Sequence, residues 1–311
     1  MRYFLGVDTS NYTTSAAFFD SETGEVIQKK RMLPVKRGER GLRQSDAVFH
    51  HNTQLPEVLE ELFSLCPPPH CIGVSVKPES RDGSYMPCFL AGECAARVIA
   101  AAFSIPIHRF SHQQGHIVSA LYSAKRLDLL SERFLAFHIS GGTTSLLLVT
   151  PNGNKLFNTK TVASTLDLKA GQLVDRIGVN LGFPFPAGKM LDETALLSQA
   201  DYFTGAHFKL KDGDCSLSGL ENKAYKMLEE KTDESDVARF IFDNIALALN
   251  EMYQAAAKTY GSLPILFSGG VTSSKALRQR ISDILPAIFS HSEFSSDNAA
   301  GVAVLSFLEE K

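Results

Sequence analysis

The chain has 311 residues, 44% of them hydrophobic, and a formal net charge of −3 from 31 basic and 34 acidic side chains. This length and balance fit a soluble protein with two sizeable lobes, and they do not indicate a protein that binds duplex DNA. The sequence contains no apolar run long enough for a membrane span and no export signal, and its five cysteines form no Cys-x-x-Cys pair, so we expect free thiols and a cytoplasmic location.

The pattern of residues 1–132 predicts one lobe, which begins with strands and continues with alternating helices and strands. Apolar, β-prone runs predict strands at residues 3–8, 13–19 and 25–33, and a polar turn joins the first two. The elements expected next are a helix at 45–65, a strand at 71–76, a helix at 88–103, a strand at 105–110 and a helix at 112–123.

Residues 133–311 predict a second lobe that opens with the same pattern. Strands at 134–139 and 145–149 flank a polar turn, and Thr143-Thr144-Ser145 repeats Thr13-Thr14-Ser15, which favours a weak internal repeat. The elements expected next are helices at 170–181, 189–199, 220–228 and 237–260, a strand at 264–267, and helices at 275–284 and 297–308. Alternating strands and helices indicate α/β layers.

Two histidines are spaced by one helical turn. His112 and His116 would share a helix face and can bind one metal ion, although two surface histidines on a polar helix are the simpler alternative. A zinc peptidase helix would carry Glu as general base after the first histidine. Gln113 stands there instead, and an amide cannot accept a proton at neutral pH, so peptidase activity is disfavoured.

Three polar turns at strand ends predict a nucleotide site. Glycine lets a backbone approach a phosphate, and N–H groups in such turns can bind it. The turns contain Asp8, Thr9 and Ser10; Ser140, Gly141, Gly142 and Thr143; and Gly269 and Gly270. Each alone also fits an ordinary tight turn. No P-loop, dinucleotide-binding glycine motif or Gly-x-Ser-x-Gly hydrolase elbow is present.

The charged side chains give weaker signals. Asp167 and Asp175 flank the start of a predicted helix, while Asp192 and Glu193 fit ordinary surface charges. Asp297 precedes the last helix, where capping and metal ligation are both open interpretations. A basic segment, residues 29–43, fits a solvated surface or a contact with RNA phosphates.

Taken in order, these motifs resemble the family of tRNA threonylcarbamoyladenosine synthase transferases. The resemblance runs nearly end to end, through residues 8–10, 112–116, 140–144, 165–188, 214–220, 268–274 and 295–303. It implies a two-lobed actin-like fold, shared by sugar kinases, heat-shock chaperones and actin, with a nucleotide cleft between the lobes.

The same resemblance implies an activity and a site. A threonylcarbamoyl group would pass from threonylcarbamoyl-adenylate to the adenosine 3′ of a tRNA anticodon. One divalent metal ion, iron or zinc, would be held by His112, His116 and Asp297. The implied substrate contacts are Ile139, Ser140, Gly141, Gly142, Thr143, Asp175, Gly188 and Ser274. Partners implied by the family are tRNA, a paralogous dimerisation subunit and a small ATPase.

Several positions depart from the family pattern. Thr143 stands where the family has histidine, Leu168 replaces the second of two aspartates, and Ser274 replaces an asparagine. These changes suggest a divergent paralogue. Two alternatives therefore stay open: a carbamoyl or phosphoryl transferase acting on a small molecule, and a non-catalytic scaffold subunit of the tRNA-modifying complex.

Overall fold

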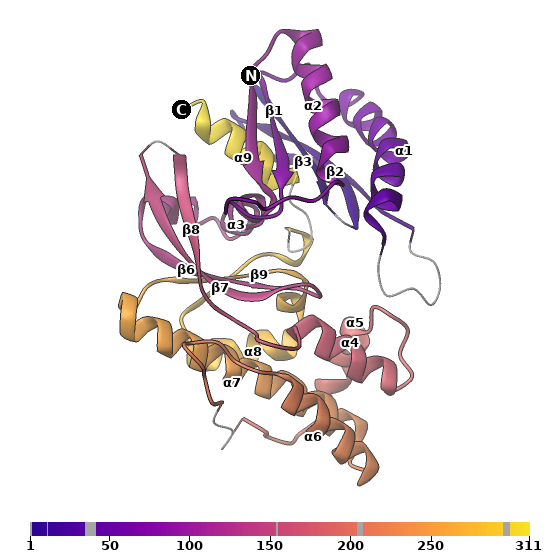
Figure 1. Ribbon diagram of the computed structural model, residues 1–311, viewed down its shortest axis with the longest axis vertical. Helices are drawn as coiled ribbons and strands as arrows, with labels where there is room; N and C mark the ends of the chain where they lie inside the picture. Colours follow the sequence, from indigo (N-terminus) through magenta and orange to yellow (C-terminus); the bar gives the residue numbers. More distant parts are fainter. Residues whose placement is uncertain (1, 11, 35–41, 154, 204–207, 295–298) are drawn as a thin grey trace. The chain divides into compact units, whose positions relative to one another are not determined.

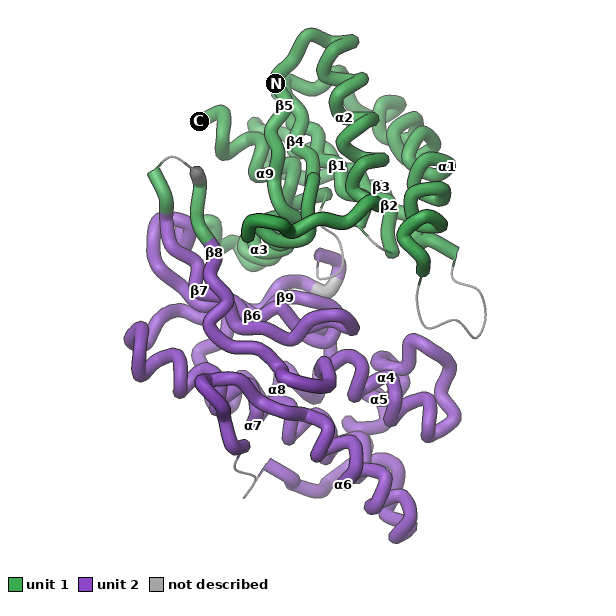
Figure 2. Tube along the Cα trace, in the orientation of Figure 1, with its two compact units in different colours: residues 1–127, 152–158, 296–311 green, residues 128–151, 159–295 purple. Residues whose placement is uncertain are grey.

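The computed structural model describes residues 2–10, 12–34, 42–153, 155–203, 208–294 and 299–311 (Figure 1). Internal contacts divide the chain into two compact units (Figure 2). Unit 1 comprises residues 1–127, 152–158 and 296–311, and unit 2 comprises residues 128–151 and 159–295. No helix in these described ranges is long and apolar enough to cross a membrane.

Unit 1 contains a five-stranded mixed sheet. Its strands are β1 (Tyr3–Ser10), β2 (Thr13–Asp20), β3 (Val26–Met32), β4 (Cys71–Lys77) and β5 (Ile107–Ser111), in the order β3-β2-β1-β4-β5. The first three strands form an antiparallel meander. β4 then pairs in parallel with β1, and β5 pairs in parallel with β4. The helices of this unit are α1 (Gln44–Phe63), α2 (Phe89–Phe103), α3 (His112–Ser123) and α9 (Ala299–Glu309).

The alternation of side chains along β1 explains how helices cover both faces of this sheet. Successive residues of a strand point to opposite faces. Leu5 and Val7 belong to a core cluster with apolar residues of α1 and α2. On the other face Phe4 packs edge-on against Phe307 of α9, with ring centroids 5.2 Å apart.

Glycines bring α9 into close contact with its neighbours in unit 1. A Cβ atom on Gly6 of β1 would lie 2.2 Å from the carbonyl oxygen of Ala299, and one on Gly301 would lie 2.0 Å from that of Gly115 in α3. Real Cβ atoms do not approach so closely, so only glycine fits these two crossings. The sequence division placed the last helix in the second lobe. The structure places it in unit 1 because its contacts are with this sheet and with α3.

Unit 2 repeats the topology of unit 1. Its strands are β6 (Phe134–Ile139), β7 (Thr144–Asn152), β8 (Lys155–Ser164), β9 (Ile265–Ser268) and β10 (Ala287–Phe289), in the order β10-β9-β6-β7-β8. Read from β8, this is the strand order of unit 1. Thr14 pairs with Thr9 in the first hairpin, and Thr144 pairs with Ile139 in the second. The predicted internal repeat is therefore confirmed, although β8 and β10 were not predicted.

The core of unit 2 lies between its sheet and its helices (Figure 1). The helices are α4 (Ala170–Asn180), α5 (Gly188–Ala195), α6 (Ser218–Glu229), α7 (Glu234–Tyr260) and α8 (Lys275–Ile284), and short 3-10 turns span Leu127–Ser131, Gly270–Ser273 and Ser292–Phe294. Most of α7 is buried, including the carboxylate of Asp243, which accepts hydrogen bonds from the Arg280 guanidinium at 2.7 and 3.1 Å. The core thus contains a paired charge as well as apolar side chains.

Candidate functional site

The two predicted metal-binding histidines lie together at the start of α3 in unit 1. The ring centroids of His112 and His116 are 4.6 Å apart. Ser111 precedes the helix and forms a capping box with Gln114: the Ser111 hydroxyl accepts the Gln114 N–H at 3.2 Å, and the Gln114 amide oxygen accepts the Ser111 N–H at 2.9 Å. This cap fixes where the helix begins and therefore where the first imidazole lies.

A buried carboxylate orients the first histidine. Asp8 on β1 is 1% exposed, and its Oδ2 lies 2.9 Å from Nδ1 of His112. Burial favours the neutral carboxyl, but His112 and the hydrogen bonds to the carboxylate outweigh burial and hold the pKa of Asp8 below its ordinary value. An ionised carboxylate only accepts hydrogen bonds, so Nδ1 carries the proton. In a neutral ring Nε2 is then the nitrogen that bears a lone pair, as in carboxylate–histidine–metal arrangements.

The neighbours of Asp8 have local structural roles. Thr9 is fully buried; its hydroxyl donates to the carbonyl oxygen of Cys88 at 3.0 Å and accepts the N–H of Gly92 at 3.1 Å. It therefore attaches the N-terminal turn of α2 to β1. The N–H of Ser10 donates to Asp8 at 3.0 Å and helps to hold the carboxylate. The contact of Asp8 with His112 was not predicted, because the position of Asp8 at a strand end indicated only a nucleotide loop.

In unit 2 the predicted phosphate turn lies between β6 and β7. The Ser140 N–H donates to the carbonyl oxygen of Thr143 at 2.7 Å, and the Thr143 N–H donates to the Ser140 hydroxyl at 3.1 Å. A Cβ on Gly141 or Gly142 would meet nothing within 4 Å, so the backbone of the turn is open on that side. A Cβ on Gly171 would lie 2.7 Å from Gly141, which brings the N-terminal end of α4 against the turn.

The second glycine turn of unit 2 lies beside the first. Gly269 has a φ of +97°, and an added Cβ would lie 2.4 Å from the carbonyl oxygen of Ile139. Both the conformation and the space require glycine here. Gly270 begins the following 3-10 turn, and a Cβ there would meet nothing within 4 Å. Ile139 itself is fully buried.

Two of the predicted substrate-contacting positions meet between α4 and α5. Asp175 of α4 accepts the N–H of Ala187 at 2.8 Å, immediately before Gly188 begins α5. Burial raises the pKa of Asp175, and the hydrogen bonds from the α5 N-terminus oppose that effect. The pair thus forms one small cluster at the start of α5.

Ser274 is hydrogen-bonded to Asp192, which the sequence pattern had indicated to be an ordinary surface charge. Its hydroxyl donates to Asp192 at 2.6 Å and accepts the N–H of Leu277 at 3.1 Å, so it caps α8. Asp192 also accepts the N–H groups of Lys275 and Ala276 at 2.9 Å each and is only 9% exposed. The interpretation of Asp192 as a surface charge was wrong, because α5 packs its carboxylate against the N-terminal turn of α8. An eight-residue helix gives too little periodicity to reveal that face.

Asp297, the third predicted metal ligand, lies outside the described residues, as do Lys36, Arg37 and Arg40 of the basic segment. The structure describes Lys29 and Arg31 of that segment, and both form ion pairs with α1. Lys29 lies 3.3 Å from Glu61, and Arg31 lies 2.6 Å from the same carboxylate. The positive charge of β3 is therefore partly neutralised within unit 1.

Comparison with solved structures defines the class of fold. The chain aligns over its full length with HypF, at a TM-score of 0.64 and 12% identity, but covers 47% of that longer chain. It aligns with component A of (R)-2-hydroxyglutaryl-CoA dehydratase from Acidaminococcus fermentans at a TM-score of 0.60 and 15% identity, covering all of both chains. A glucokinase of the ROK family from Streptomyces griseus aligns at 0.54. The predicted actin-like fold is thereby confirmed.

Sequence comparison defines the family. The tRNA N6-adenosine threonylcarbamoyltransferase family matches residues 33–304, and this chain belongs to it. The relative from Methanopyrus kandleri is 23% identical over 91% of this chain and 81% of its own length, and that from Enterococcus faecalis is 27% identical over 99% and 90%. Both carry the name tRNA N6-adenosine threonylcarbamoyltransferase. The family resemblance is confirmed, and it places the chain among transferases.

Proposed function

We propose that this protein transfers a threonylcarbamoyl group from threonylcarbamoyl-adenylate to the exocyclic amine of the adenosine 3′ of a tRNA anticodon. Family membership supports the class of reaction. The observation that carries the proposal is the pair His112 and His116, the first of which is oriented by buried Asp8. Such a pair fits a metal ion, and iron or zinc suits a site of two imidazoles and one carboxylate.

His112, His116 and Asp297 would hold the metal. The fit rests on the Asp8 contact, which fixes the tautomer of His112 and so presents one lone pair from a set direction. In the sequence Asp297 stands two positions before Ala299, the first residue of α9; within the described residues, α9 crosses α3 where Gly301 meets Gly115, one residue before His116. When bound, the metal would supply Lewis-acid polarisation of the threonylcarbamoyl group.

The remaining residues bind and position the donor. The phosphate would lie against the turn at residues 140–143, where the open backbone of Gly141 and Gly142 and the α4 N-terminus both favour an anion. The adenosine amine attacks the carbamoyl carbon, the new N–C bond forms, and the C–O bond to phosphate breaks. The departing AMP takes the electron pair, and the amine proton passes to solvent. No covalent enzyme intermediate is needed.

The proposed partners follow from the family. A paralogous dimerisation subunit and a small ATPase would act together with the chain on tRNA. A cytoplasmic location fits this substrate. Peptidase activity is not proposed, because Gln113 on α3 occupies the place of the general base that a zinc peptidase helix carries.

One observation favours a second candidate function, transfer to a small molecule. The family's second aspartate is replaced by Leu168, which is 5% exposed and belongs to the core of unit 2. Its neighbour Asp167 accepts hydrogen bonds from the Leu217 N–H at 2.8 Å and the Ser218 hydroxyl at 2.6 Å. The substitution leaves a buried apolar side chain at one of the two acidic positions, and the retained carboxylate of Asp167 is engaged in internal hydrogen bonds, as expected if the acceptor or donor differs.

Metal analysis of matched variants tests the proposal. His116→Ala should lose one equivalent of bound metal together with transferase activity, whereas His50→Ala, at a half-exposed histidine on α1, should retain both. Metal content is read by plasma mass spectrometry and transfer by nucleoside mass spectrometry. Full activity of His116→Ala after chelation would overturn the metal-dependent mechanism. Metal binding without tRNA modification, in the presence of the partner subunits, would support the small-molecule candidate.

A further inference from the structure

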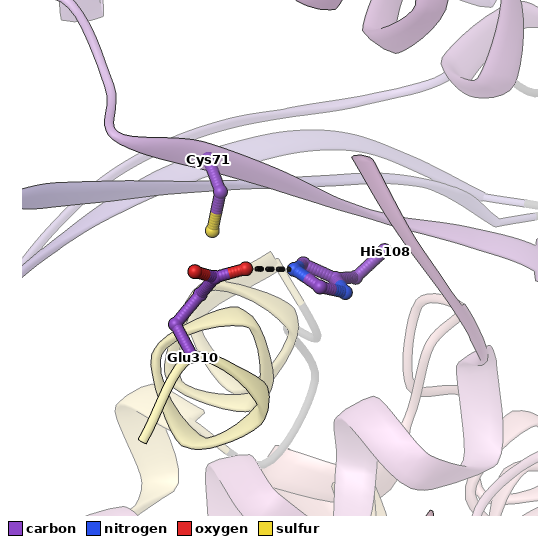
Figure 3. A group of neighbouring side chains, drawn as sticks. All are labelled: Cys71, His108 and Glu310. Atoms are coloured by element: carbon purple, nitrogen blue, oxygen red, sulfur yellow. Dashed lines mark hydrogen bonds and ion pairs between the residues drawn. The ribbon is translucent and has the colours of Figure 1, made fainter. Parts of the chain in front are cut away.

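A second group of metal-binding side chains lies in unit 1, formed by Cys71, His108 and Glu310 (Figure 3). They come from the start of β4, from β5 and from the residue that follows α9. The sulfur, imidazole nitrogen and carboxylate oxygen all lie within 4.8 Å of one another. Residues so far apart in the sequence converge only because α9 packs against this sheet.

The geometry of the group is close to that of a metal site. Nε2 of His108 lies 2.7 Å from Oε1 of Glu310, and Figure 3 shows the Cys71 thiol directed toward the same carboxylate. Zinc bonds of about 2.0–2.3 Å place tetrahedral ligands roughly 3.3–3.7 Å apart. The His108 and Glu310 side chains would therefore move apart by roughly half an ångström to admit an ion. Their side chains are 24% and 27% exposed, so an ion can enter from solvent.

A further imidazole lies beside the group. Nε2 of His70 is 3.9 Å from Oε2 of Glu310, the other oxygen of the same carboxylate. His70 is therefore a candidate for a fourth ligand. A thiolate, one or two neutral imidazoles and a carboxylate form a donor set that binds zinc in preference to calcium or magnesium.

The charges also favour a cation. Cys71 is fully buried, and its thiol lies within 4.8 Å of the carboxylate of Glu310. The thiol is 3.8 Å from the carbonyl oxygen of Ser306, a weak hydrogen bond. A divalent cation would be neutralised by one thiolate and one carboxylate, and the thiol proton would pass to solvent as the metal binds.

We propose that Cys71, His108 and Glu310 form a zinc site, distinct from the histidine pair on α3, that attaches the end of α9 to β4 and β5. The site does not depend on the proposed transferase function. The alternative is a structural ion pair between His108 and Glu310 beside a buried thiol. That arrangement would bind no metal, so metal titration separates the two.

The test uses the full chain carrying His112→Ala and His116→Ala, which removes the two histidines of the other proposed site. Cobalt(II) replaces zinc in such sites, and a thiolate ligand produces an intense near-ultraviolet charge-transfer absorption that histidine and carboxylate ligands do not. We expect one equivalent of cobalt to produce this absorption and zinc to abolish it by displacement. Adding Cys71→Ser should remove the absorption, whereas adding Cys94→Ser, at an exposed cysteine, should leave it unchanged.

A second variant keeps the test decisive if Cys71→Ser does not fold. Glu310→Gln alters a surface-accessible carboxylate and should weaken cobalt binding at least tenfold, while circular dichroism remains that of the parent. The proposal is overturned if the double histidine variant gives no charge-transfer absorption, if the absorption survives Cys71→Ser, or if Glu310→Gln binds cobalt with unchanged affinity.

Discussion

The crossing of α3 and α9 gives a quantitative prediction for Gly301→Ala. The added Cβ would lie 2.0 Å from the Gly115 carbonyl oxygen and 2.7 Å from the Ser119 nitrogen. A tolerable carbon–oxygen contact is about 3.3 Å or more, so the helices would separate by roughly 1.3 Å. Overpacking of this kind costs about 1–3 kcal/mol, against a gain of at most about 1 kcal/mol from helix propensity. We expect a net loss of about 1–2 kcal/mol, which should lower the melting temperature by roughly 2–8 °C.

The same displacement should weaken metal binding. A metal site tolerates ligand displacements of only about 0.2 Å, and α3 carries His112 and His116. Gly301→Ala should therefore reduce metal content even where the protein stays folded. The matched control is Gly219→Ala on α6, whose Cβ would meet nothing within 4 Å, so its stability and metal content should not fall. Calorimetry and metal analysis read both effects, and an unchanged melting temperature for Gly301→Ala would refute the close-packing argument.

Three further predictions concern side chains whose environments are fixed by the fold. Asp192→Ala removes the acceptor for three hydrogen-bond donors at the α8 N-terminus and should lower the free energy of unfolding by about 2 kcal/mol, measured in urea. Glu193→Ala, at an exposed neighbouring position of α5, should change that free energy little. Burial raises the pKa of Asp175, so its contribution to stability is complete below the unfolded pKa of about 3.9 and is lost as the pH rises through the folded pKa. The stability of Asp175→Asn relative to wild type should therefore increase between pH 4 and pH 7 in parallel urea titrations. A stability difference that stays constant with pH would contradict this. Iodoacetamide at pH 8 should modify exposed Cys94 and spare Cys215. Burial raises the pKa of Cys215 to about 12, which leaves roughly one Cys215 thiol in ten thousand ionised at pH 8. Equal modification of both cysteines, measured by peptide mass spectrometry, would contradict this.

The sequence predicted the elements whose periodicity is strong and local. The repeated hairpins came from apolar alternation and from matching Thr-Thr-Ser triplets, and the structure gives them the same strand order in both units. Two strands were missed for physical reasons. β8 (Lys155–Ser164) is largely polar and contains two lysines, and β10 (Ala287–Phe289) has only three residues.

The candidate site was partly predictable for the same reason. His112 and His116 are separated by one helical turn, and that spacing brings their rings together without long-range information. The contact of Asp8 with His112 depends on how β1 and α3 pack, and no local pattern shows it. The convergence of Cys71 with Glu310 depends on the packing of α9 against the sheet of unit 1. Local periodicity predicted that helix but placed it in the second lobe.

The most direct test of the proposed function compares two tRNA transcripts in the presence of threonylcarbamoyl-adenylate, metal and the partner subunits. One transcript carries adenosine 3′ of the anticodon, and the other carries guanosine there. We expect threonylcarbamoyladenosine, detected by nucleoside mass spectrometry, from the first transcript and none from the second. Absence of the modified nucleoside from the first transcript, with metal-loaded wild-type protein and active partners, would contradict the assignment of tRNA as the acceptor.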